Sequence, residues 1–255
     1  MRLTTYDREG ARRLGAWVGD TLVDLPEAVG HPSFPATLEG LVTRSLGSAM
    51  QAATAALSNP DYVAEALVPK PRLLPPLLLS EDGAVVRTGG ELAWPASTPC
   101  EWQPEVACVI GRAGRNVSVT EASGVIFGYL LASEWFGAGD PEGSRPAAMS
   151  LGPCLVTAEG FDPAEVTVTA RVNRGVWARE RIGDAASRFA RTIARASKER
   201  EVRPGEVFGS SPFQPAENSD GRRRLARDAT VEIEAGPLGT LRTRVRFKKS
   251  SPDPA

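Results

Sequence analysis

One stretch of the chain, from Glu101 to Asp140, constrains the fold more than any other. It contains a short apolar run, Glu105 to Gly111, with an acid at its start and a glycine at its end, which is typical of a buried strand. Ser118 to Glu121 then forms a capping-box pattern, which predicts a helix start. A second apolar run, Val125 to Ala132, follows. The stretch therefore predicts two strands joined by a turn and a short helix.

Three polar side chains lie next to these two runs. Gln103 and Glu105 alternate with Pro104 in the first run, and Glu134 follows the second. If the two strands pair, we expect these three side chains to converge at one strand end. Oxygen-bearing side chains in such a group are what a hard divalent cation needs. The pattern thus predicts a candidate site for Mg²⁺ or Mn²⁺.

The motifs of this stretch resemble those of the fumarylacetoacetate hydrolase family. Members of that family have, in the same order and at similar spacing, Glu-x-Glu, Val-Ile-Gly, Arg-Asn-Val-Ser, Phe-Gly-Tyr and Asn-Asp. The matching segments here are Gln103 to Glu105, Val109 to Gly111, Arg115 to Ser118, Phe127 to Tyr129, and Ser133 to Glu134. The chain is therefore similar to that family and is expected to be a divergent member.

The resemblance implies both a fold and a site. It implies a β-rich α+β fold, a mixed β-roll around a central cavity, preceded by a small α+β module. In the family, two glutamates and an aspartate bind the metal, whereas here only Glu105 matches, because Gln103 and Glu134 replace the other two. We therefore expect Mg²⁺ or Mn²⁺ to be weakly bound or absent. Gln103, Tyr129 and Ser211 are expected to contact the substrate, with Ser210 standing where members have a glycine.

The remaining sequence predicts the domain organisation. Residues 1–68 contain short strand-like runs, a Gly19-Asp20 hairpin turn and an Ala-rich helical pattern at 38–57, and are expected to form the small module. Prolines make residues 69–76 a connector that is neither helix nor central strand. Residues 77–249 are expected to form the catalytic-type domain, closed by a hairpin, and 250–255 a loose tail.

A general base that the family carries is missing from this sequence. Hydrolytic members have a histidine on a lid helix just after the connector, and residues 77–100 contain no histidine. The chain's single histidine, His31, lies between Gly30 and Pro32 and is interpreted as a loop residue. Glu81 and Asp82 either supply a base or form a polar turn before a strand.

Two groups of arginines, Arg145 and the run Arg222 to Arg227, each have two possible roles. Arg145 is the cation nearest to the position of a family lysine that is missing here, and it either clamps a substrate carboxylate or lies on a solvated loop. The run Arg222 to Arg227 either grips an anionic substrate or is a solvated loop.

Composition bounds the class of protein. The 255 residues, 42% of them hydrophobic, suffice for one sizeable core. No apolar stretch approaches the roughly 18 residues of a membrane span, and no signal pattern is seen, so we expect a cytoplasmic protein. The three cysteines have no metal-type spacing, and we expect them to be reduced thiols. A net charge of −1 gives no reason to invoke nucleic acid or a membrane surface. The expected partners are a small-molecule carbonyl substrate and, by resemblance, a second copy in a homodimer.

Three functional hypotheses follow. The first is a metal-dependent hydrolase or decarboxylase of acylpyruvate or oxaloacetate type. The second is a repurposed lyase, isomerase or cyclase that uses Glu105, Glu134 or Arg145 for acid–base chemistry on an enolisable β-dicarbonyl or polyketide-like substrate in biosynthesis. The third is a non-catalytic scaffold subunit. Because the hydrolytic base is missing, the second is favoured.

Overall fold

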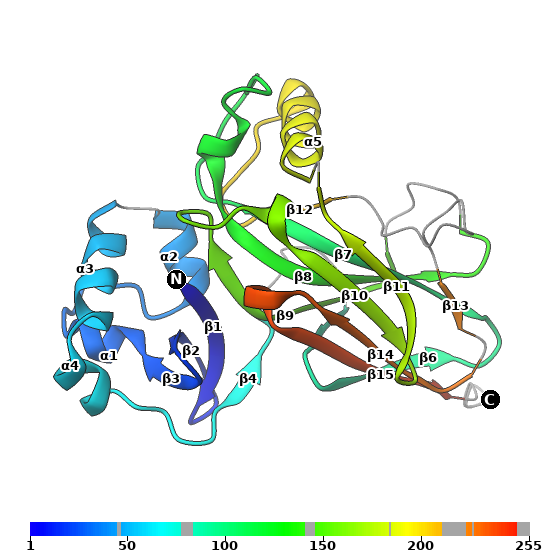
Figure 1. Cartoon of the computed structure of the whole chain (residues 1–255), viewed down its shortest axis with the longest axis horizontal. Coiled ribbons are helices and arrows are strands. Elements are labelled where there is room, and N and C mark those ends of the chain that lie inside the picture. The colour runs from blue at the N-terminus through cyan, green and yellow to red at the C-terminus, as the bar shows by residue number, and fades with distance from the viewer. Residues whose placement is uncertain are drawn as a thin grey trace, which may run out of the picture.

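Two β-sheets enclose the main core, and helices lie outside them (Figure 1). The computed structural model describes residues 1–44, 47–77, 84–140, 146–183, 185–210, 223–225 and 227–248. Strands outnumber helices, so the predicted β-rich α+β class is confirmed. Within the described part, the larger sheet has ten strands and the smaller has five, and each contains one parallel pair among antiparallel ones.

The larger sheet has the order β12-β7-β8-β9-β1-β2-β3, with β13, β4 and β5 attached to β7, β1 and β9. Its strands are β1 (Arg2–Arg8), β2 (Ala11–Val18), β3 (Thr21–Asp24), β4 (Arg72–Leu74), β5 (Ala84–Arg87), β7 (Cys100–Ile110), β8 (Ile126–Gly137), β9 (Ala148–Thr157), β12 (Val207–Gly209) and β13 (Arg223–Leu225). The smaller sheet has the order β11-β10-β14-β15-β6. Its strands are β6 (Gly90–Pro95), β10 (Thr167–Val172), β11 (Gly175–Arg181), β14 (Ala229–Glu234) and β15 (Thr240–Lys248).

The helices gather in two places (Figure 1). Four short ones lie at the N-terminal side: α1 (Leu25–Val29), α2 (Leu38–Arg44), α3 (Gly47–Leu57) and α4 (Pro60–Glu65). The longest, α5 (Ala185–Glu199), lies apart from them and packs Phe189 and Ile193 into the core between the sheets. Three short 3₁₀ turns complete the described elements: η1 (Ala122–Val125), η2 (Pro163–Glu165) and η3 (Gly236–Leu238).

Alternation along β7 places its side chains in two different cores. Trp102, Val106 and Cys108 point into the core shared with the smaller sheet. Ala107 and Val109 point to the opposite face, where they join the core that contains residues of α1, α2 and α3. Because successive side chains of a strand face opposite sides, Gln103 and Glu105 share the face of Ala107. The candidate site therefore lies on the face of the sheet that the N-terminal helices partly cover.

The N-terminal part is an α+β unit, but its strands continue the larger sheet. Arg2 and Leu3 of β1 pair with Val156 and Leu155 of β9. One sheet therefore contains strands from both sides of the predicted connector. Within the connector, residues 72–74 form the short strand β4, which pairs with β1 and is flanked by prolines. The domain boundaries thus stay a prediction, while the continuous sheet holds the two parts together.

Local predictions in these regions had different outcomes. The Gly19-Asp20 turn joins β2 to β3 as expected. The predicted helix at 38–57 is instead two helices, α2 and α3. Ser118 and Glu121 exchange the hydrogen bonds of a capping box, and the short helix that follows them is the 3₁₀ turn η1.

Candidate functional site

Gln103, Glu105 and Glu134 come together, as the sequence predicts. Strands β7 and β8 are antiparallel with Gln103 directly opposite Glu134 and Glu105 opposite Ala132. The side-chain amide nitrogen of Gln103, Nε2, donates to Oε1 of Glu105 at 2.5 Å and to Oε2 of Glu134 at 3.2 Å. One amide group therefore joins two carboxylates that lie on neighbouring strands.

Burial changes the chemistry of this group. The exposed fraction is 4% for Glu105 and 9% for Gln103, while Glu134 is half-buried. Burial and the nearby charge of Glu134 raise the pKa of Glu105 to about 8, and the hydrogen bond from Gln103 opposes that rise. At neutral pH the Glu105 carboxyl is therefore mostly protonated and able to donate a proton.

Two short described strands pair with β7 on either side of the group. On one edge of β7, β13 pairs with residues 100–102 and β12 with residues 107–109, so among the described strands none pairs with residues 103–105 on that edge. Val106 accepts there from the backbone N–H of Ser210 at 2.9 Å. Pro104 faces the same edge two residues earlier and has no N–H to donate there. The candidate site thus lies on β7 between the residues that pair with β13 and those that pair with β12.

Gly209, the last residue of β12, closes one side of the site. A Cβ atom built on Gly209 would lie 1.6 Å from Oε2 of Glu105 and 2.8 Å from its carboxyl carbon. Only glycine allows the carboxylate to rest against the backbone at this point. Gly209 was not identified from the sequence, although Ser210, the next residue, was noted as standing where family members have a glycine. The available signal was a glycine that ends a strand beside the motif.

Tyr129 does not belong to this group. It lies on β8 on the face opposite to Glu134, with an exposed fraction of 6%, and its ring centroid lies 5.5 Å from that of Phe161 and 5.6 Å from that of Phe189. Burial raises the pKa of Tyr129 to about 12, so it stays protonated. The predicted substrate contact does not fit this position, because the Phe-Gly-Tyr motif places the ring in the core.

Several predicted residues lie outside the described part of the chain. They are Arg145, Ser211, Glu81, Asp82 and Arg222. Arg223 and Arg224 are exposed on β13. His31 is exposed in a loop, where its Nδ1 accepts from the backbone of Ser33 at 3.2 Å, as its interpretation as a loop residue requires.

The same contacts test whether a metal fits. The site offers two carboxylates and an amide, but the amide presents its N–H side to both carboxylates, so a cation between them would face N–H dipoles. Among the described residues, no group of three or more His, Cys, Asp or Glu side chains is arranged to hold a metal ion. This arrangement fits a hydrogen-bonded carboxylate pair and does not fit a divalent cation.

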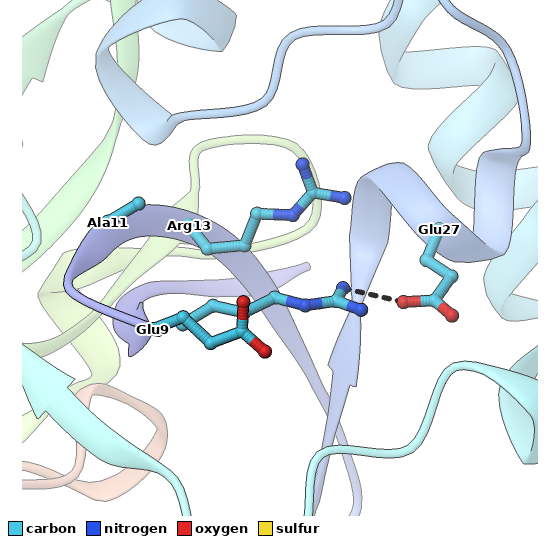
Figure 2. A pocket seen from close by; sticks show the side chains of 5 residues that line it. Glu9, Ala11, Arg13 and Glu27 are labelled. Atoms are coloured by element: carbon cyan, nitrogen blue, oxygen red, sulfur yellow. Dashed lines mark hydrogen bonds and ion pairs between the residues drawn. The ribbon is translucent and has the colours of Figure 1, made fainter.

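A separate hollow of about 460 Å³ lies in the N-terminal part (Figure 2). Arg8, Arg13 and Glu27, which line it, are held in ion pairs. Arg8 Nη1 lies 2.6 Å from both Glu27 and the buried Asp24, and Arg13 Nε lies 2.8 Å from Asp24. Because the arginines neutralise these acids, we interpret the hollow as part of a structural network and not as a catalytic site.

No helix in the described part of the chain has the length and apolarity that crossing a membrane would require.

Comparisons with solved structures find the same fold in several proteins. The chain is similar to maleylpyruvate hydrolase from Sphingobium sp. SYK-6 in complex with manganese(II) and pyruvate, at 19% identity and a TM-score of 0.72, over 98% of this chain and 100% of that one. It is similar to 5-carboxymethyl-2-hydroxymuconate delta-isomerase from Mycobacterium smegmatis, at 20% identity and a TM-score of 0.71, over 97% of this chain and 100% of that one. It is also similar to fumarylacetoacetate hydrolase from Exiguobacterium antarcticum, at 17% identity and a TM-score of 0.71, over 97% of this chain and 100% of that one. At such low sequence identity, the similarity shows the fold alone.

Sequence comparison decides the family. No curated protein matches the chain. Residues 50–246, well over half of the chain, match the family described as fumarylacetoacetate (FAA) hydrolase C-terminal. The chain therefore belongs to the fumarylacetoacetate hydrolase family.

Proposed function

We propose that this chain is an isomerase or lyase that acts by acid–base chemistry on an enolisable β-dicarbonyl or polyketide-like substrate, including cyclase-type reactions. The observation that carries the proposal is the pair of carboxylates, Glu105 and Glu134, joined by Gln103 on the paired strands β7 and β8. Two carboxylates in different surroundings are a recurrent means of providing one acid and one base.

The two carboxylates have different roles in this proposal. Glu134, the more exposed of the two, removes a proton from the carbon between two carbonyl groups. Glu105, protonated in its buried position, gives its proton to the carbonyl oxygen as the enol forms. Return of a proton to a different atom completes an isomerisation, and exchange with solvent restores the pair. No oxidant or further reactant is required.

The relatives support a carbonyl substrate. Their names include hydrolases and an isomerase, so the same fold is used for both reaction classes. An isomerisation needs only proton transfers, whereas hydrolysis of an acylpyruvate also needs an activated water. No histidine that could activate this water lies in residues 69–100. The isomerisation does not need such a group, so we favour it.

The second candidate is a metal-dependent hydrolase or decarboxylase of acylpyruvate or oxaloacetate type. The manganese and pyruvate bound to the Sphingobium relative favour it. It requires a cation, and here Gln103 and Glu134 replace two of the family's three acidic ligands. We therefore propose that Mg²⁺ or Mn²⁺ binds weakly or not at all, and that a non-catalytic scaffold is the remaining alternative.

An activity assay separates these proposals. Wild type, Glu105→Gln and Glu134→Gln are tested against acylpyruvates, oxaloacetate and β-keto acids, with the exposed Glu65→Gln on α4 as a matched control. We expect isomerisation or C–C cleavage by wild type and Glu65→Gln, and a loss of about two to four orders of magnitude in the other variants. Efficient acylpyruvate hydrolysis by wild type would support the second candidate. Activity unchanged in both site variants would show that the site lies elsewhere.

We also propose a homodimer, because members of this family commonly pair through the catalytic domain. The chain mass is 27.1 kDa, so light scattering of the protein at micromolar concentration should give about twice that value. A mass equal to one chain would contradict this proposal.

A further inference from the structure

The amide of Gln103 has an unusual position for a neutral side chain. A glutamine amide carries two N–H donors on one nitrogen, and here that nitrogen lies 2.5 Å from Glu105 Oε1 and 3.2 Å from Glu134 Oε2. Both contacts are hydrogen bonds donated by the amide. The nitrogen therefore lies between two carboxyl groups that would otherwise face each other without a shared donor.

The strands hold this nitrogen in place. Gln103 and Glu105 are two residues apart on β7 and so lie on one face, and Gln103 is directly opposite Glu134. Opposite residues of an antiparallel pair have Cβ atoms only about 4.5–5.5 Å apart. The register break between β7 and β8 lies between Val109 and Ile110, well away from the group. The contact follows from regular strand geometry.

Glu105 is also fixed from its other side. Its Oε1 accepts from Gln103, while its Oε2 rests against Gly209, within 1.6 Å of the point that a Cβ would occupy. The carboxylate is thus confined between the amide and the β12 backbone. Two buried carboxyl groups this close need a donor or a cation at the oxygens that face each other, because unsatisfied buried oxygens are costly and the charge of one group disfavours the charge of the other.

We infer that the Gln103 amide takes the place of a bound cation in this chain, joining Glu105 to Glu134 and positioning both. Gln103 is therefore a positioning residue, and the site keeps its geometry without a metal. The inference deepens the proposed function, because it concerns the same side chains, but its test does not depend on turnover.

The test uses Mn²⁺ binding and thermal melting of the full chain. Electron paramagnetic resonance follows the signal of free Mn²⁺ at equimolar protein in the micromolar range, and melting is recorded in EDTA and in Mn²⁺. The variants are Gln103→Glu, which restores a third carboxylate, and Gln103→Met, which keeps the length but removes the donors. Gln51→Glu on the exposed surface of α3 is the matched control.

We expect wild type and Gln51→Glu to leave the Mn²⁺ signal unchanged and to melt at the same temperature in EDTA and in Mn²⁺. Gln103→Glu should melt lower in EDTA, because three carboxylates repel, and rise by about 5 °C or more in Mn²⁺ as a site forms. Gln103→Met should melt lower than wild type in both media, since the donors are lost and Mn²⁺ finds only two carboxylates.

Three results would overturn the inference. One is uptake of an equivalent of Mn²⁺ by wild type, which is measured even if a variant fails to fold. Another is a folded Gln103→Glu that does not bind Mn²⁺, and the last is a Gln103→Met that melts like wild type. If no β-dicarbonyl is turned over, the proposed function fails while these measurements still decide the role of Gln103.

Discussion

Gly209, which has no side chain, determines how close Glu105 comes to the backbone of β12. Gly209 leaves room for the carboxylate, and a Cβ there would overlap Oε2 at 1.6 Å. Gly209→Ala should therefore displace Glu105 and break its contact with Gln103. We expect activity to fall at least about tenfold and stability to fall by about 1–3 kcal/mol, the usual cost of overpacking.

A matched substitution separates this effect from the general consequences of adding a methyl group. Gly47 begins α3, and beyond its chain neighbours and the backbone of its own helix no atom lies within 4 Å of the position that its Cβ would take. Gly47→Ala should leave activity unchanged and stability equal or slightly higher, because alanine favours helix. Kinetic assays and urea unfolding of both variants check this. Equal activity in the two variants would contradict the role assigned to Gly209.

Asp24 joins three elements at the N-terminal end. Its carboxylate accepts from Tyr6 Oη at 2.6 Å, from Arg8 Nη1 at 2.6 Å and from Arg13 Nε at 2.8 Å, and it caps α1 through the backbone N–H of Glu27 at 2.9 Å. These donors come from β1, β2 and α1. Burial alone would raise the pKa of Asp24, but the hydrogen bonds outweigh burial and lower the pKa below its ordinary 3.8.

Asp24→Asn should destabilise the fold by about 2–4 kcal/mol, because it removes the charge that two arginines share in a buried position. Since the folded pKa of Asp24 is lowered, its contribution is fully present above pH 3.8 and is lost as the pH falls below that value. Unfolding at pH 7 and at pH 3 measures this, with the exposed Asp20→Asn as control. An equal difference between wild type and Asp24→Asn at both pH values would contradict the assignment.

At the scale of elements, short apolar runs predicted the strands well, because a strand inside a sheet is buried on both faces. The runs at 105–111 and 125–132 correspond to β7 and β8. Helix length was less predictable. Gly40 and Gly47 weaken the helical pattern at 38–57, and local sequence does not determine whether packing overrides them. The capping box likewise determined hydrogen bonds, but not how many turns followed.

The site was predictable to the extent that it depends on β7 and β8. The i, i+2 spacing of Gln103 and Glu105 requires a shared face, and pairing brings Glu134 opposite. Gly209 was missed because its approach depends on β12, which is distant in sequence and only three residues long. Tyr129 was misplaced because its motif specifies a strand but not which face the ring takes.

The two sheets are joined across the core by a buried polar chain. Trp135 on β8 donates through Nε1 to Ser150 Oγ on β9 at 3.1 Å, and Thr243 on β15 donates to the same oxygen at 3.0 Å. All three residues are buried, with exposed fractions of 0%. The chain links the larger sheet, which carries the site, to the smaller one.

Ser150→Ala should leave the Trp135 N–H and the Thr243 hydroxyl without their acceptor. Unsatisfied buried groups cost about 1–3 kcal/mol, so the urea midpoint should fall accordingly. The exposed Ser123→Ala serves as control and should change stability by less than about 0.5 kcal/mol. Equal midpoints for both variants would show that the polar chain contributes nothing to the joining of the sheets.

The central claim is that Glu105 and Glu134, positioned by Gln103, move protons on a β-dicarbonyl without a cation. The most direct measurement is exchange of solvent deuterium into the carbon between the two carbonyls of an acylpyruvate, followed by NMR in excess EDTA against a blank without enzyme. We predict exchange above the blank for wild type and Glu65→Gln, and a loss of about two orders of magnitude or more for Glu105→Gln. Exchange at the blank rate in EDTA that appears only when Mn²⁺ is added would contradict the account.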